Sequence, residues 1–253
     1  MSDQYALQGR FYQAVFGMRM AEDSRPERAV TVSDGYVGLN INPRKPGRPA
    51  GLDHFGLEVD DAEAACERLA RHRGVHFVKR PTTRPFAGIS AHDPAGNVFD
   101  ISQADMENRK SVYVEKPRDE PRRISHLAIR TLQVEEVARF YEEVFGLERL
   151  RSALGEELTD GRVRLVLMPW DIRDYADGGI VRPGPDHIGF TVESIEALKE
   201  RIAGVGDNNP HLRPQPLGAG KEGAARLALF AKCAHGSWQL ADPDGILIDV
   251  AEG

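Results

Sequence analysis

Residues 10–18 read Arg-Phe-Tyr-Gln-Ala-Val-Phe-Gly-Met, and residues 139–147 repeat them closely as Arg-Phe-Tyr-Glu-Glu-Val-Phe-Gly-Leu. Three more landmarks recur in the same order. They are Asp34-Gly35 with Asp160-Gly161, Asp53-His-Phe-Gly-Leu-Glu-Val59 with Asp186-His-Ile-Gly-Phe-Thr-Val192, and Asp93-Pro-Ala-Gly-Asn-Val-Phe-Asp100 with Asp242-Pro-Asp-Gly-Ile-Leu-Ile-Asp249. Four landmarks in one order indicate a tandem duplication.

A charged, proline-containing stretch separates the two copies. It runs over residues 104–123 and is expected to be a solvated linker between a domain at 1–103 and a domain at 124–253. In the second copy, alternating apolar residues predict a strand over 124–129. A helix is expected over 132–146, followed by short strands, and a second strand begins at Asp186. Its helix is expected to start after Ser194 and stop at Gly204. Each copy therefore reads as two strand–helix–strands modules, an α+β fold.

The first copy starts differently. Aligning Arg10 with Arg139 places Met1 opposite Arg130, one residue beyond the expected strand 124–129. The first module is therefore predicted to lack its opening strand, including a counterpart of His126. We expect the true start of the gene to lie upstream of Met1; a naturally incomplete half is the alternative.

Composition narrows the class of function. The 253 residues carry a net charge of −6, so no broad basic face for nucleic acid is expected. No apolar run approaches the ~20 residues of a membrane helix, and the first ten residues do not resemble a signal peptide. Cys66 and Cys233 are isolated, which argues against a disulfide framework or cysteine chemistry. The sequence predicts a cytoplasmic protein that acts on a small molecule.

Strand alternation places three residues that can bind a metal on the face of their strands opposite the apolar side chains. His126, His187 and Asp249 each oppose the large apolar residues of their own strands. Two imidazoles and one carboxylate form the facial triad of non-haem Fe(II) oxygenases, and three protein ligands leave coordination positions open. Whether the first copy forms a second site from His54, Asp100 and Asn40 stays open at this point.

These motifs resemble the vicinal oxygen chelate superfamily, which includes glyoxalase I, bleomycin-resistance proteins and extradiol ring-cleaving dioxygenases. The residues that carry the resemblance are Phe140-Tyr141 with Phe145-Gly146, Asp186-His187-Ile188-Gly189-Phe190, and Asp242-Pro243-Asp244-Gly245 with Asp249. The resemblance implies four βαβββ modules in two glyoxalase-like cupped-sheet domains. It also implies a metal centre in the C-terminal domain and a degenerate site in the N-terminal one.

The resemblance also implies a fourth ligand, Glu or Gln, in glyoxalase-like members. That position is Val166 here, which cannot ligate. Three ligands and four modules are similar to extradiol dioxygenases, although those usually have Glu at Asp249 and Tyr at Gln239. His235 is the candidate to replace that tyrosine as the catalytic residue. Residues 226–232 are expected to form a strand. From this region Phe230, Lys232 and Trp238 are the substrate-binding candidates, with Arg226 on the same expected face.

Three functions remain open at this point. The favoured one is an Fe(II) dioxygenase acting on a catechol-like or other vicinal-oxygen substrate. The second is a glyoxalase- or epimerase-type lyase or isomerase that uses Mn, Zn, Ni or Co to stabilise an enediolate. The third is a metal-free resistance-type protein that binds a small ligand. Because modules of this superfamily also pair across subunits, a homodimer is compatible with the resemblance.

Overall fold

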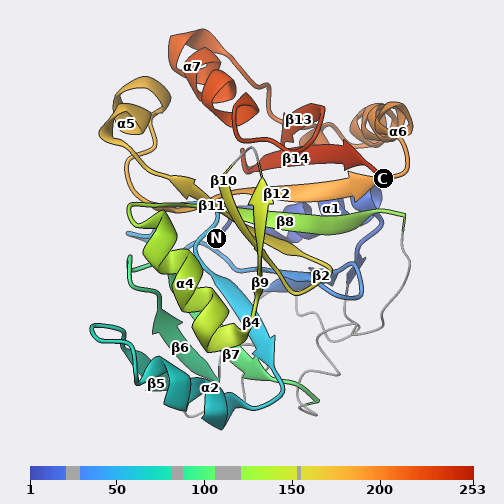
Figure 1. Cartoon of the computed structure of the whole chain (residues 1–253). Helices are drawn as coiled ribbons and strands as arrows, with labels where there is room; N and C mark the ends of the chain where they lie inside the picture. The colour runs from blue at the N-terminus through green and yellow to red at the C-terminus, as the bar shows by residue number, and fades with distance from the viewer. Residues whose placement is uncertain (21–28, 81–87, 106–120, 153–154) are drawn as a thin grey trace. The chain divides into compact units, whose positions relative to one another are not determined.

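The computed structural model describes residues 1–20, 29–80, 88–105, 121–152 and 155–253. Most of the linker expected at 104–123 falls outside these ranges. The described chain forms two compact units (Figure 1). One contains residues 1–53, 121–125 and 187–253. The other contains residues from 54 to 105 and from 126 to 186.

The first unit combines the two ends of the chain. Its N-terminal part holds α1 (Tyr5–Phe16), β1 (Arg19–Met20), β2 (Val30–Ser33) and β3 (Gly38–Ile41). Its C-terminal part holds most of β12 (Gly184–Val192), then α6 (Ile195–Asn208), the 3-10 helix η1 (Pro210–Leu212), α7 (Gly220–Ala231), β13 (Trp238–Ala241) and β14 (Leu247–Glu252). Helix α1 packs on α6. The Phe16 ring stacks on Phe190 of β12 with 3.9 Å between ring centroids, so one aromatic core joins the two parts.

The second unit combines the middle of the chain. It holds β4 (Phe55–Val59), α2 (Ala62–Leu69), β5 (Phe77–Lys79), β6 (Ile89–His92) and β7 (Val98–Gln103). It also holds most of β8 (Arg123–Thr131), then α4 (Val134–Phe145), β9 (Glu148–Ser152), β10 (Gly155–Thr159), β11 (Arg164–Pro169) and α5 (Ile172–Gly178). Helices α2 and α4 pack on each other. The rings of Phe99, Phe140 and Tyr141 form the centre of the core.

The strands form three sheets. The largest has the order β13-β14-β12-β8-β11-β10-β9, and Figure 1 shows β14 and β12 side by side. The other two have the orders β1-β2-β3 and β4-β7-β6-β5. Each copy of the repeat thus follows the expected α+β pattern, and α1 is the first helix or strand in the described residues. An isolated parallel bridge pairs Ser2 with Pro43. It matches the pairing of Thr131 with Pro169 at the end of β8, as the alignment of the copies requires.

Helix ends follow the sequence signals in part. The Ser194 hydroxyl accepts the Ala197 N–H at 3.2 Å and caps α6, as expected, but α6 continues through Gly204 to Asn208. Helix α4 ends at Gly146, whose φ of 69° favours glycine, although it begins two residues later than expected. None of the helices in the described ranges is long and apolar enough to cross a membrane.

The expectation of a strand over 226–232 is wrong, because these residues belong to α7 or follow it directly. The segment Gly220–Ala231 reads GKEGAARLALFA. It is rich in alanine and leucine, the residues with the highest helix propensity, and Glu222 lies in the first turn. A short apolar run does not distinguish strand from helix by alternation alone.

The repeated tyrosine and aspartate motifs meet inside each unit. In the first unit the Tyr12 hydroxyl donates to Asp242 Oδ2 at 2.8 Å. In the second unit the Tyr141 hydroxyl makes the equivalent bond to Asp93 Oδ2 at 3.4 Å. Burial raises the pKa of both tyrosines and both aspartates above their usual values. In each unit, the tyrosine motif of one copy of the repeat therefore contacts the aspartate motif of the other copy.

Candidate metal centre

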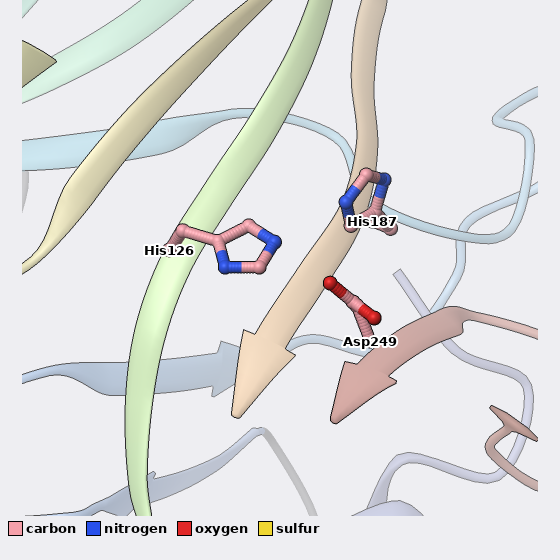
Figure 2. A group of neighbouring side chains, drawn as sticks. All are labelled: His126, His187 and Asp249. Carbon is pink, nitrogen blue, oxygen red and sulfur yellow. The ribbon is translucent and has the colours of Figure 1, made fainter. Parts of the chain in front are cut away.

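Three neighbouring strands bring His126, His187 and Asp249 together. The residues lie on β8, β12 and β14, and their side chains converge (Figure 2). One ligand atom from each lies within 4.8 Å of the others. The side chains are deeply buried, with 3%, 0% and 1% of each residue exposed. The three residues predicted from strand alternation are therefore adjacent in space.

This donor set fits a divalent metal ion. Two imidazole nitrogens and one carboxylate oxygen suit Fe, Mn, Zn, Ni or Co, and three protein ligands leave further positions for a substrate. The chemistry of the set therefore supports a metal centre at these residues.

A glycine opens space beside the carboxylate. In the parallel pairing of β12 with β14, Gly189 lies opposite Asp249 and His187 lies opposite Leu247. The absence of a side chain at Gly189 leaves room next to the Asp249 carboxylate on this face of the sheet. The spacing of His187 and Gly189 in the repeated motif thus serves the geometry of the cluster.

The Asp249 carboxylate is held by three donors. The backbone N–H groups of His235 and Gly236 donate to Oδ2 at 2.6 and 2.9 Å. The Gln239 amide, which faces Asp249 across the β13–β14 pair, donates to Oδ1 at 3.2 Å. Such surrounding hydrogen bonds fix the orientation of a ligating side chain and tune its affinity for a metal. Gln239 thus contacts the carboxylate from the position where the resemblance implies a tyrosine.

The other site residues expected from the sequence are distributed unevenly. Phe230 is buried at the end of α7, and its ring centroid is 4.7 Å from that of His187. Lys232 is the exposed C-cap of α7. Trp238 lies opposite Val250, on the face away from Asp249, with the Lys199 ammonium 5.5 Å from its ring centroid. The structure therefore brings Phe230 and the backbone of His235 to the cluster, and leaves Lys232 and Trp238 away from it.

Cys233 is also near the cluster. Its Sγ atom belongs to a group with His187 and Asp186 in which one ligand atom from each lies within 4.8 Å of the others. The thiol donates to the Phe230 carbonyl at 3.2 Å. The sequence does not indicate this proximity, because Cys233 and His187 are far apart along the chain. The turn after α7 places Cys233 near the start of β12.

Sequence reasoning missed Glu157. This residue lies on β10 opposite Val166, the position without a fourth ligand, and Val166 lies opposite Ala128 on β11 and β8. Alternation therefore places Glu157 on the same face as His126. Only 1% of its side chain is exposed, and the Arg164 guanidinium is 3.4 Å from its Oε2. The sequence feature that could have indicated this residue is a glutamate within a strand whose other residues are largely buried.

The N-terminal counterpart of the centre is built differently. His54 Nε2 lies 3.2 Å from Asp100 Oδ2, so these two side chains pair directly. The Ser90 hydroxyl donates to Asp100 Oδ1 from the position equivalent to Gln239. Burial raises the pKa of Asp100, but the hydrogen bonds from His54 and Ser90 outweigh it, and the pKa lies below its usual value. Asn40 accepts a hydrogen bond from Thr31 at 3.4 Å. This half therefore shows a histidine–aspartate pair.

Comparison with known proteins identifies the family. The model of the Glyoxalase/Bleomycin resistance protein/Dioxygenase superfamily matches residues 7–101 and 123–250. The chain belongs to this superfamily. The two matched segments correspond to the two copies of the repeat.

Solved structures show the same fold at low identity. The Mn(II)-bound glyoxalase from Novosphingobium aromaticivorans is 13% identical with a TM-score of 0.59, over 99% of this chain and 78% of that one. A catechol 2,3-dioxygenase is 15% identical with a TM-score of 0.58, over 100% and 85%. A xylose isomerase-like TIM barrel/4-hydroxyphenylpyruvate dioxygenase fusion protein is 14% identical with a TM-score of 0.58, and this chain spans 46% of its length. These likenesses concern the fold.

Proposed function

We propose that this protein is a divalent-metal-dependent enzyme of the superfamily, and that it acts as an Fe(II) extradiol-type dioxygenase on a catechol-like or other vicinal-oxygen molecule. The buried cluster of His126, His187 and Asp249 carries the proposal. An iron ion held there would supply open coordination positions and electron transfer toward dioxygen. Val166, where a fourth ligand would stand in glyoxalase-like members, favours the dioxygenase.

The chain's own residues have separable tasks in this proposal. His126, His187 and Asp249 hold the ion, while Gln239 and the backbone at His235 fix the carboxylate. The ring of Phe230 covers the His187 imidazole and keeps water from that side. The His235 imidazole, which follows the turn beside Asp249, is proposed to transfer the substrate proton.

Glu157 supports a second candidate function, a glyoxalase- or epimerase-type reaction. Such a reaction needs a base near the carbon that loses its proton, and a carboxylate is suited to that role. Glu157 is a buried carboxylate on the His126 face of the sheet. In this case the metal acts as a Lewis acid, with Mn, Zn, Ni or Co in place of iron.

Metal content per chain tests these proposals. Protein purified without oxygen is analysed by plasma mass spectrometry as wild type, His126→Ala and His54→Ala, the last being the matched change in the N-terminal half. We expect about one iron per chain, lost in His126→Ala and retained in His54→Ala. Oxygen uptake is then measured with catechols.

The other outcomes separate the alternatives. Another divalent metal at similar occupancy, with activity that is lost in Glu157→Gln and needs no oxygen, would support the lyase or isomerase. No bound metal after reconstitution would contradict both enzymatic proposals and favour a metal-free binding protein.

A further inference from the structure

A cavity of about 180 Å³ lies in the first unit beside α7. Its walls come from the segment 215–219, from α7, and from the facing ends of β13 and β14. Leu217, Leu227, Ala241 and Leu247 make its wall largely apolar, and Arg226 is the charged residue among those that line it. A cavity of about 150 Å³ is large enough to hold benzene. This one therefore has room for one aromatic ring or a short apolar chain.

The cavity adjoins the metal ligands on the same face of the sheet. Leu247 lies opposite both His187 and Ala241, while Asp249, two residues further along β14, lies opposite Gln239. Alternation places Leu247 and Asp249 on one face.

A second line of contacts runs through α7. The Arg226 guanidinium carbon lies 6.0 Å from the centroid of the Phe230 ring, and that ring lies 4.7 Å from His187. The guanidinium and the His187 imidazole thus both contact the Phe230 ring, so one side chain separates Arg226 from this metal ligand.

We propose that this cavity is the subsite for the anionic part of the substrate, with Arg226 pairing with its carboxylate. The substrate class is then a hydroxylated aromatic acid with a single ring, in preference to a neutral catechol. A cation on an apolar wall favours an anion, because the apolar surroundings strengthen the attraction between the two charges. A guanidinium also matches a carboxylate with two parallel hydrogen bonds. The assignment of this ligand as substrate rests on the function proposed above; the binding of the acid does not.

The test measures binding of benzoate and of its neutral analogue benzamide to the metal-free full chain. Ligand-observed NMR titration gives the two affinities. Arg226→Met removes the charge but keeps a flexible side chain to pack on Phe230. Lys232→Met is the matched control, since Lys232 is an exposed cation at the end of the same helix.

We expect wild type to bind benzoate at least about tenfold more tightly than benzamide. Arg226→Met should weaken benzoate about tenfold to hundredfold, the usual range for a hydrogen-bonded charge, and leave benzamide unchanged. Lys232→Met should change neither.

Three results would overturn the proposal: equal affinity of wild type for the two probes, loss of benzoate in Lys232→Met instead, or equal loss of both probes in a folded Arg226→Met. If Arg226→Met does not fold, Arg226→Gln decides, because it also removes the charge but keeps a polar side chain, and it should lose the preference for benzoate. Metal content is measured on the same proteins as purified without oxygen, before the metal is removed for the titration. Selective benzoate binding without metal would contradict the proposed function alone, and full metal occupancy without selectivity would contradict the subsite alone.

Discussion

Gly236→Ala should damage the metal centre although it replaces none of the proposed ligands. A Cβ atom at residue 236 would overlap the backbone carbonyl of Val250 and would lie 2.7 Å from Asp249 Oδ1. Neither the strand backbone nor the held carboxylate can move away cheaply. The turn that carries residue 236 must therefore shift, and its N–H donors to Asp249 shift with it.

The size of the effect follows from these contacts. Overpacking at a rigid position costs about 1–3 kcal/mol, and a hydrogen bond to a charged group contributes about 1.5–3 kcal/mol. We expect the free energy of unfolding to fall by roughly 2–4 kcal/mol, since some strain relaxes when the turn moves. Because the hydrogen-bond partners of a ligand are disturbed, metal affinity should fall by about 10- to 100-fold.

Urea unfolding and a metal competition titration measure the two effects. Gly204→Ala is the matched control, because it adds the same methyl group inside α6, where nothing lies within 4 Å of the new atom. It should raise the free energy of unfolding by about 0.5–1 kcal/mol, the usual gain for alanine in a helix, and leave metal binding unchanged. Equal behaviour of the two variants would refute the reasoning.

Three further predictions concern the groups around the two centres. Gln239→Leu removes the amide donor to the ligating carboxylate and should weaken metal binding about 10- to 100-fold in the same competition titration; an unchanged affinity would deny this amide a positioning role. Tyr12→Phe should lower the free energy of unfolding in urea by about 1.5–3 kcal/mol, since the Tyr12 hydroxyl donates to a buried carboxylate at 2.8 Å. Tyr141→Phe should lower it less, because the hydrogen bond of Tyr141 is longer. A larger loss in Tyr141→Phe would contradict the geometry. Asp100 has a lowered pKa in the folded protein, so it stabilises the fold above its unfolded pKa of about 3.9 and the contribution is lost as pH falls through the folded pKa. Asp100→Asn should therefore destabilise more at pH 7 than at pH 3, as unfolding at both values would show, and an equal loss at both would speak against the lowered pKa.

Much of the centre could be predicted because it depends on periodicity. Strand alternation depends only on neighbouring positions, so it placed His126, His187 and Asp249 on one face without any knowledge of distances. Glu157 could not be predicted because it lies on a different strand from Val166, the family's usual position for a fourth ligand. Which residue lies opposite Val166 depends on the register of the two strands. Register is a property of paired strands and is not visible in one strand alone.

The rest depended on tertiary context. The strand expected over 226–232 rested on alternation within a short apolar run, and the helix propensity of its alanines and leucines outweighed it. The sequence alone also could not predict which modules pack on each other. The duplication shows that equivalent motifs exist, but the partner of Tyr12 is Asp242, from the far end of the chain.

That pairing has a consequence for the order in which the protein is made. The bond from Tyr12 to Asp242 spans 230 positions, so the first unit needs residues that the ribosome adds last. The described residues of the second unit, from 54 to 105 and from 126 to 186, are all available earlier. Helix α1 therefore emerges before the Phe190 ring that packs on Tyr12 and Phe16 has been made. During that interval its apolar face is a natural target for chaperones, and a stalled chain would expose it.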